Sequence, residues 1–334
     1  HFMDKRILIG IVLCWMACEK QAETIVHQGY ALGTSYGVQY APIDHTYAHV
    51  QKGIDSLFYI INASLSTYLP ESAISKINRG DSLISVDEHF QKVYAQANLV
   101  WTATKGYFDP TIGAWTNAYG FGPDKALVNI NEQQRDSLMQ ITGWKRIQLT
   151  SDLRVRKEKA EIYIDFNAIA KGYTVDLIAH YLSQLGSQHH LVEIGGEIVA
   201  KGESPKTGEA WKIGIDSPNE MAERSIQSIL SLSNEALATS GNYRKFRIDE
   251  ITGEKYVHSI NPLSGKPVRS KVLSVSVKAP NCMIADAYAT ALMVMPFGQS
   301  KALISDHPEL EAYWILADSL GGVKEVFSKG FQKK

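Results

Sequence analysis

The chain has 334 residues, of which 45% are hydrophobic and 21% charged, an ordinary globular composition that suffices for one large or two modest domains. Its 34 Lys and Arg against 35 Asp and Glu give a net charge of −1 without any basic tract, which argues against a nucleic-acid partner. The signatures of Rossmann dehydrogenases, P-loop enzymes, zincins and α/β-hydrolases are all missing from the sequence, which argues against those enzyme classes.

Residues 1–22 have the pattern of a leader that precedes the folded domain. The two residues before the first methionine resemble a cloning scar, and a positive pair is followed by an apolar stretch from 7 to 17. That stretch is too short to cross a bilayer as a helix, but it suits a secretory signal. Ala17 directly before Cys18 resembles a bacterial lipoprotein cleavage site. We therefore expect a lipidated Cys18, a short linker, and a single domain over 23–334; the alternative is a plain signal peptide cleaved slightly later.

Three segments in the first half of the chain have helical periodicity. Tyr47 to Leu65 and Glu88 to Lys105 repeat apolar residues at helical spacing, and Ser85-Val86-Asp87-Glu88 predicts a capping box before the second helix. Asn131 predicts a cap for a helix that runs to Thr142, and Gly143 predicts its end.

Strands and turns dominate the pattern after residue 160. Glu161 to Phe166 alternates and predicts a strand that leads into a helix from Ala168 to Leu185, closed by Gly186. Two short apolar runs around Gly195-Gly196 predict a β-hairpin, Leu191–Ile194 with Glu197–Ala200. Further predicted strands are Trp211–Ile215, Ser228–Ser233, Lys245–Asp249 and Leu273–Lys278. This mixture predicts an α+β fold with mixed, largely antiparallel sheets and flanking helices.

The segment from Ala285 to Met295 predicts a nearly apolar helix that carries Asp286 and Thr290. Residues four apart lie on one helix face, with Cβ atoms about 6 Å apart. A carboxylate and a hydroxyl are hard oxygen ligands of the kind Mg²⁺ takes. The alternative is a buried Asp286 that accepts backbone hydrogen bonds and a Thr290 that bonds back to its own helix.

Two segments place polar residues beside glycines. In Asp165 to Tyr173, backbone N–H groups and Lys171 near a helix start suit an anion such as a phosphate, unless Asn167 is only a cap and Lys171 is solvated. In Gly106 to Gly113, Pro110 favours extended geometry at Asp109 and directs its carboxylate into a cleft. The alternative there is an Asx-type turn without function.

Two further segments suggest a ligand site. Leu237 to Tyr243 predicts a small-residue turn, and His258 to Gly265 supplies a histidine before an Asn-Pro turn; together they would bring hydroxyls and an imidazole to one site. Ser66-Thr67-Tyr68, followed by Ser72, offers an aromatic ring that can stack on a planar ligand. Their alternatives are a structural histidine and a packed tyrosine.

Taken together, these segments resemble the ApbE family, the FAD:protein FMN transferases, over nearly the whole mature chain. The matching pieces, in order, are Ala31-Leu32-Gly33-Thr34, Ser66-Thr67-Tyr68 with Ser72, Gly106 to Gly113, Trp115 with Gly120-Phe121-Gly122, Asp165 to Asp176, Gly195-Gly196-Glu197, Trp211 to Pro218, Ala238 to Tyr243, His258 to Gly265 and Ala285 to Met295.

The resemblance implies binding of FAD and Mg²⁺ and transfer of FMN, through a phosphoester, to a Thr or Ser of an acceptor protein, with release of AMP. Asp286, Thr290 and the backbone carbonyl of Ala168 would hold the metal, and Tyr68 would stack on the isoalloxazine. The residues that would line the FAD site, in a cleft between two lobes, are Leu32, Tyr107, Phe108, Asp109, Asp165, Lys171 and Ile260.

We further hypothesise that His258 takes the proton from the acceptor hydroxyl, because an unperturbed histidine titrates near neutrality. Two positions depart from relatives: some carry a carboxylate at the position of Ala289, which puts a second metal in doubt, and others carry Glu in place of Lys171. The resemblance also implies an exported protein on the periplasmic side of a bacterial membrane, with acceptors among the flavoprotein subunits of membrane ion-pumping redox complexes.

Two other functions stay open at this stage. One is a metal-dependent FAD pyrophosphatase that yields FMN and AMP, and the other is a periplasmic FAD-binding lipoprotein without turnover. AMP release separates the binder from the enzymes, and peptide-bound FMN separates the transferase from the hydrolase.

Overall fold

The computed structural model describes residues 23–127, 130–218, 225–242, 246–248, 255–257, 259–318 and 322–331. The predicted leader 1–22, with Cys18, and the predicted catalytic His258 lie outside the described residues. Within these ranges the α-helices are α1 Tyr47–Leu65, α2 Ala73–Asn78, α3 Glu88–Ala103, α4 Gly113–Ala118, α5 Glu132–Gln140, α6 Ala170–Gln184, α7 Cys282–Val294 and α8 Phe297–Asp306, and short 3₁₀ turns occupy Pro110–Ile112 and Trp144–Arg146. Across the same part of the chain, no helix combines the length and the apolar character needed to cross a membrane.

An eight-stranded sheet forms the centre of the fold, and every neighbouring pair in it is antiparallel. Its strands, in spatial order, are β1 Ile25–Ala31, β2 Thr34–Tyr40, β5 His190–Ile194, β6 Glu197–Lys201, β9 Glu235–Gly241, β14 Val272–Ala279, β15 Glu311–Ala317 and β16 Val323–Phe327. The two-stranded ribbons are β3 Ile147–Leu149 with β4 Val155–Lys157, β7 Trp211–Asp216 with β8 Ile226–Leu232, β10 Phe246–Ile248 with β11 Lys255–Val257, and β12 Ile260–Asn261 with β13 Lys266–Pro267. The predicted α+β class with largely antiparallel sheets is confirmed.

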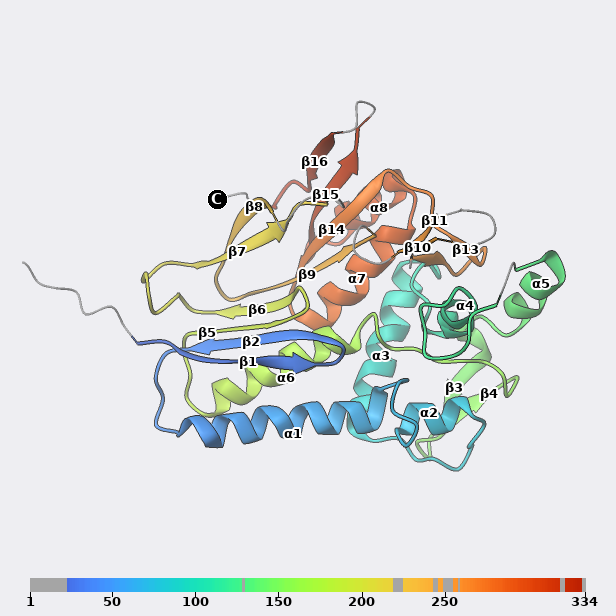
Figure 1. The fold of residues 1–334 in the computed structure, drawn as a ribbon, viewed down its shortest axis with the longest axis horizontal. Helices are drawn as coiled ribbons and strands as arrows, with labels where there is room; N and C mark the ends of the chain where they lie inside the picture. Colours follow the sequence, from blue (N-terminus) through green and yellow to red (C-terminus); the bar gives the residue numbers. More distant parts are fainter. Residues whose placement is uncertain are drawn as a thin grey trace, which may run out of the picture.

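The two faces of the sheet bury different partners. On β15, Ala312 and Trp314 belong to a core shared with α3 and α7, whereas Tyr313 and Ile315 belong to a core shared with the β7–β8 ribbon. This alternation is what the two-residue period of a strand dictates. Figure 1 shows α7 crossing the middle of the molecule and α6 running between the β1–β2 hairpin and α1. Helix α7, which carries Asp286 and Thr290, and helix α6, which follows Ala168, therefore pack on one face of the sheet.

Most of the predicted elements occur at or near the predicted positions. Helix α1 has the predicted bounds, and α6 is followed by Gly186 at φ +93°, the left-handed geometry expected where a helix closes on glycine. The hairpin around Gly195-Gly196 is present as β5 and β6. The predicted small-residue turn from Leu237 to Tyr243 is wrong, because residues up to Gly241 form β9, in the interior of the sheet.

The predicted strand Glu161 to Phe166 is also wrong, although its alternation is real. Ile162, Ile164 and Phe166 are fully buried, yet the segment pairs with no strand that the structure describes. The Asn78 side chain takes the place of a neighbouring strand: its Oδ1 accepts from the Ile164 amide at 2.8 Å and its Nδ2 donates to the Ile164 carbonyl at 2.8 Å. Its alternate residues are therefore buried although it joins none of the sheets in the described part of the chain.

The predicted capping box before α3 takes a different form. Asp87, rather than Ser85, is the N-cap, and its carboxylate accepts from the Phe90 amide at 2.8 Å. Ser85 lies two residues earlier in an isolated β-bridge with Arg154, so its backbone is already extended. By contrast, the predicted cap of α5 is a capping box between Asn131 and Gln134.

Candidate functional site

Asp286 and Thr290 lie one turn apart on α7, as the sequence predicts. The side chain of Asp286 is 2% exposed, and its Oδ2 accepts a hydrogen bond from the backbone amide of Gly172 at 2.9 Å. A Cβ at Gly172 would lie 2.3 Å from the Cys282 carbonyl oxygen, so the approach of α6 to α7 requires glycine there. The backbones of Gly172 and Cys282, more than one hundred positions apart in the sequence, are therefore in contact.

The contact between Gly172 and Asp286 also explains why a nearby carbonyl is available. In an uninterrupted α-helix the amide of Gly172 would bond the carbonyl of Ala168, four residues earlier. Here that amide donates to Asp286 instead, and within the described residues the Ala168 carbonyl accepts no hydrogen bond. The Thr290 hydroxyl likewise has no hydrogen bond in the described part of the chain, so the predicted alternative of a back-bond to its own helix is not observed. Carboxylate, hydroxyl and carbonyl oxygens form a donor set that fits Mg²⁺.

Lys171 lies between two buried carboxylates rather than in solvent. Its Nζ is 2.7 Å from Oε1 of Glu197 and 4.0 Å from Oδ1 of Asp286. Burial alone would lower the pKa of Lys171, but the charges of Asp286 and Glu197 raise it above its ordinary value, so the side chain stays a cation. Burial raises the pKa of Asp286, and the Lys171 ammonium opposes that rise.

Glu197, at the start of β6, has an uncommitted oxygen. The residue is 2% exposed, and within the described residues its Oε2 is buried without a hydrogen-bond partner. Burial raises the pKa of Glu197 to about 8 against the opposing charge of Lys171. A buried carboxyl oxygen without a partner is uncommon in folded proteins, and it marks this cluster as a place built for something other than packing.

The turn that contains Leu32 lies beside the turn that precedes Glu197. Leu32 joins β1 to β2 with φ +51°, and a Cβ at Gly195 would lie 2.7 Å from the Thr34 side chain. Thr239 of β9 adds a third neighbour, since its amide donates to the Gly196 carbonyl at 3.3 Å. Sheet pairing thus brings the predicted Leu32 and the Lys171–Glu197–Asp286 cluster to neighbouring parts of the fold.

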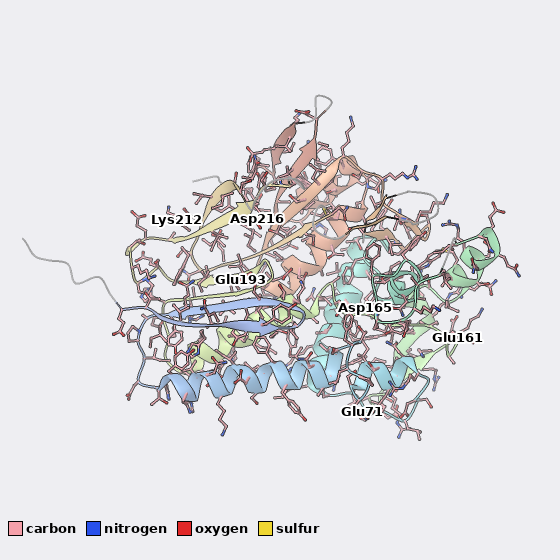
Figure 2. All side chains as sticks on the ribbon, in the orientation of Figure 1. Glu71, Glu161, Asp165, Glu193, Lys212 and Asp216 are labelled. Atoms are coloured by element: carbon pink, nitrogen blue, oxygen red, sulfur yellow. The ribbon has the colours of Figure 1, made fainter. Side chains whose placement is uncertain are left out.

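Tyr68 and Asp165 form a second group, linked to the first by the short segment that ends at Ala168. The Tyr68 side chain is 60% exposed, and its hydroxyl donates to the Phe121 carbonyl at 3.4 Å. Partial burial raises the pKa of Tyr68, and the charge of Asp165 adds to the rise. Asp165 lies near the middle of the molecule in Figure 2, and its carboxylate accepts from the Asn167 amide at 2.7 Å. An exposed aromatic ring close to a carboxylate is an arrangement that suits a planar polar ligand.

Asp109 is buried, and its carboxylate accepts hydrogen bonds from nearby residues. Oδ1 accepts from the amide of Thr111 at 2.8 Å and from its hydroxyl at 2.5 Å, and Oδ2 accepts from the Trp144 amide at 3.0 Å. Burial raises the pKa of Asp109, while these hydrogen bonds oppose the rise. The geometry is that of the predicted Asx-type alternative. Phe108 is 3% exposed in the main core, with Tyr107 packed against it.

Ile260 lies in a small apolar cluster with Trp115 and Tyr119. The Tyr119 hydroxyl donates to the Gly265 carbonyl at 3.0 Å, which ties the two segments together. These contacts place the segment after His258 against the one that follows Gly106–Gly113.

Sequence reasoning missed Glu197 and Asp176 as candidate site residues. Asp176 lies on α6, one turn after Gly172, and its carboxylate accepts from the amides of Cys282 at 2.8 Å and Met283 at 2.8 Å. Burial raises its pKa to about 6. The available signal was similar for both residues: each is an acid followed by apolar residues, Glu197 directly after Gly196 and Asp176 four residues after Gly172.

Two surface cavities, of about 370 and 360 Å³, lie elsewhere, around Lys278 and around Arg156, and no predicted site residue lines either of them. The flavin cleft between two lobes therefore stays a prediction. Among the described residues no group of three His, Cys, Asp or Glu side chains could hold a metal. The candidate cation site differs from that type, since only Asp286 contributes such a side chain.

The fold and the candidate site define a class: antiparallel α+β proteins with a cluster of buried carboxylates and a lysine where two helices pack. Comparison with known proteins identifies the family. The profile of the ApbE family matches residues 32–314. The FAD:protein FMN transferase of Haemophilus influenzae is 33% identical, covering 98% of this chain and 96% of its own length, and that of Vibrio cholerae is 33% identical over 98% and 97%.

Solved structures agree with the sequence comparison. The flavin transferase ApbE from Vibrio cholerae superposes with a TM-score of 0.84 at 32% identity, covering 93% of this chain and 98% of that one. The flavinyl transferase ApbE of Pseudomonas stutzeri, in its apo form, gives a TM-score of 0.82 at 27% identity over 93% and 96%. The chain belongs to the ApbE family, and it is an enzyme of the transferase class.

Proposed function

We propose that this chain transfers FMN from FAD to a Thr or Ser side chain of an acceptor protein, depends on Mg²⁺ and releases AMP. The observation that carries the proposal is the hydrogen bond from Gly172 to Asp286, which brings the Ala168 segment to the Asp286–Thr290 face of α7. The proposal is also supported by two curated relatives named FAD:protein FMN transferase, which this chain matches over almost their whole length.

The Mg²⁺ would be held by oxygen atoms of Asp286, Thr290 and the Ala168 carbonyl. The Thr290 hydroxyl and the Ala168 carbonyl make no hydrogen bond within the described residues, so both can bind a cation. When bound, the ion would offset charge on the FAD diphosphate as AMP leaves. Lys171 supports the same charge balance as a permanent cation 4.0 Å from Asp286. Because the sequence predicts an anion such as a phosphate beside Lys171, this side chain would hold and orient the FAD diphosphate.

The other site residues bind and orient the flavin. Tyr68, with its exposed ring, stacks on the isoalloxazine, and Asp165 lies close enough to influence the Tyr68 hydroxyl. Leu32, Tyr107, Phe108, Asp109 and Ile260 line the rest of the site, and three of them, Phe108, Asp109 and Ile260, are buried.

His258 takes the proton from the acceptor hydroxyl as that oxygen attacks the FMN phosphorus. A bond from the acceptor oxygen to phosphorus forms and the phosphoanhydride bond to AMP breaks, so the acceptor ends as a phosphoester. The test is His258→Ala measured in single-turnover transfer, with FAD binding as the control. Loss of transfer with intact FAD binding supports the role, and a full transfer rate excludes it.

One assay separates the three candidate functions. The protein is incubated with FAD, Mg²⁺ and a flavoprotein subunit that carries a target Thr, then AMP, free FMN and in-gel flavin fluorescence are measured together. AMP with fluorescent acceptor supports the transferase. AMP with free FMN alone indicates a pyrophosphatase, and no AMP indicates a flavin-binding protein without turnover.

The predicted lipidation of Cys18 extends the proposal to location: an enzyme anchored on the periplasmic side of a bacterial membrane, where its acceptor subunits are exposed. This proposal is supported by the leader pattern of residues 1–22. Replacement of Cys18 by Ser with retention of the membrane-bound fraction would exclude it.

A further inference from the structure

The first amides of α7 are capped by two side chains, Asp176 on α6 and Asn281, the residue that precedes α7. Its first two amides, of Cys282 and Met283, donate to the two oxygens of Asp176 on α6. The third, of Ile284, donates to Oδ1 of Asn281 at 2.9 Å, directly before α7 itself. A helix start exposes such amides, and each needs an acceptor. Both side chains cap α7, but of these two only Asp176 ties it to α6.

Each of the two helices contributes an aspartate that accepts a hydrogen bond from a backbone amide of the other helix. Asp176 on α6 accepts from the first turn of α7, and Asp286 on α7 accepts from Gly172 in the first turn of α6. Gly172 is four residues before Asp176, and Cys282 is four residues before Asp286, so the two ties are one helical turn apart on each helix. Because the backbones touch at Gly172, α7 has little freedom to approach further, and these hydrogen bonds fix its position along α6.

We propose that Asp176 is a positioning residue for the cation site: by binding the first amides of α7 it holds that helix on α6 in the position that brings Asp286 and Thr290 to the Ala168 carbonyl. This inference rests on the cation site of the proposed function. Asp176 contacts backbone amides of 282 and 283, so its effect on the cation passes through the placement of α7. A negative charge at a helix N-terminus also interacts favourably with the helix dipole.

The test compares two variants of the full chain that weaken the same helix start. Asp176→Asn keeps the size of the side chain but replaces one acceptor oxygen by an NH₂ group, so one of the two amides loses its partner. Asn281→Ala removes the other cap and leaves the tie to α6 intact. Flavin-free protein is titrated with Mn²⁺, read as the electron paramagnetic resonance signal of the free ion, and thermal unfolding is recorded for each variant.

Both variants should lower the Tm, because each removes a helix cap. Asp176→Asn should in addition weaken Mn²⁺ binding by about tenfold or more, the range found when partners that orient metal ligands are changed. Asn281→Ala should bind Mn²⁺ as the unaltered protein does. Equal Mn²⁺ affinity in the two variants would show that Asp176 only stabilises the helix, and it would overturn the proposal.

If Asp176→Asn does not fold, Asp176→Glu decides the question, since it keeps the charge but lengthens the side chain and displaces α7. Weakened Mn²⁺ binding by the folded Asp176→Glu supports the proposal, and unchanged binding overturns it. Failure of the proposed function has a different signature: the unaltered protein does not bind Mn²⁺, or Asp286→Asn binds it equally well. Mn²⁺ binding that depends on Asp286 but not on Asp176 refutes only the inference about Asp176.

Discussion

Asp109 and Asp286 are both buried carboxylates that the sequence predicts at the site, but the fold treats them differently. Asp109 is 8% exposed and accepts three hydrogen bonds, from the amide and hydroxyl of Thr111 and the amide of Trp144. Asp286 is 2% exposed and accepts one amide hydrogen bond, with the Lys171 ammonium 4.0 Å away. A carboxylate offers about four lone-pair positions, so Asp109 is nearly satisfied and Asp286 is not.

Burial alone therefore does not identify a ligand-binding acid. Burial raises the pKa of both carboxyl groups, so the electrostatic signal is also shared. What separates them is the capacity left over after local hydrogen bonding. Glu197, with an Oε2 that has no partner among the described residues, belongs with Asp286 in this respect.

Replacement of Lys171, the cation beside Glu197 and Asp286, should have the largest effect on these buried carboxylates. The raised pKa of Glu197, about 8, means that the folded protein keeps a proton that the unfolded chain has released between pH 4.5 and 8. The contribution of this group to stability therefore falls as pH rises through that window. At pH 9, Lys171→Met leaves two buried carboxylates without their cation, and we expect a loss of about 3–5 kcal/mol in the free energy of unfolding.

At pH 6 the same variant should lose much less stability, because Glu197 is then protonated. Urea unfolding of Lys171→Met at both pH values measures the difference. The double variant Lys171→Met with Glu197→Gln is the control and should recover most of the loss at pH 9. An equal loss at pH 6 and pH 9 would contradict this account of the cluster.

Asp286→Asn tests whether the remaining hydrogen-bonding capacity of Asp286 serves a cation. Because changing a residue that merely orients a metal ligand costs about 10–100-fold in affinity, loss of the ligand charge itself should weaken Mn²⁺ binding and slow FMN transfer by about 100-fold or more. Thr290→Val, which keeps the side-chain shape but loses the hydroxyl, should have a smaller effect of the same kind. Cation titration and single-turnover transfer are the measurements, and normal Mn²⁺ binding by Asp286→Asn would remove the cation site.

Asp109→Asn should show the opposite profile. The amide side chain has one acceptor oxygen fewer, so a buried donor from Thr111 or Trp144 loses its partner, and we expect about 1–3 kcal/mol less stability in urea unfolding. Mn²⁺ affinity should stay that of the unaltered protein. If this variant instead weakened Mn²⁺ binding as strongly as Asp286→Asn, the contrast between the two carboxylates would be broken.

Local sequence predicted the parts of the fold that local forces decide. The periodicity of Tyr47–Leu65 predicts α1, and Gly195-Gly196 predicts the hairpin, because helix faces and tight turns depend on neighbouring residues. The segment from Glu161 to Phe166 failed as a strand because its backbone partner is the side chain of Asn78, far away in the sequence. Strand β9 was missed because small residues such as Ala238 suit a turn until α7 is known to pack on them.

In the candidate site, too, local sequence predicted the features that depend on neighbouring residues and missed the contacts between distant segments. The spacing of Asp286 and Thr290 on one helix face is a local property and is observed. The partnership of Lys171 with Glu197, at 2.7 Å, depends on how the β5–β6 hairpin meets α6, and no local pattern carries that information. The same holds for Asp176, whose acceptor role appears only when α7 is placed against α6.

Tyr68 offers the mildest comparison, since its ring is 60% exposed while the two carboxylates are buried. Little packing is lost in Tyr68→Ala, so stability should change by no more than about 0.5 kcal/mol. Flavin affinity should fall by up to about tenfold, because an aromatic pair is worth about 0.5–1.5 kcal/mol. Quenching of FAD fluorescence in titrations measures this affinity.

Tyr68→Phe is the matched control, because it keeps the ring and loses only the hydroxyl that reaches the Phe121 carbonyl at 3.4 Å. If stacking is the role of Tyr68, this variant should bind FAD nearly as the unaltered protein does. Equal weakening by Ala and Phe would assign the effect to the hydroxyl instead. We therefore expect Tyr68, which holds its ligand through an exposed ring, to affect binding without affecting stability, and Lys171, which contacts two buried carboxylates, to affect both.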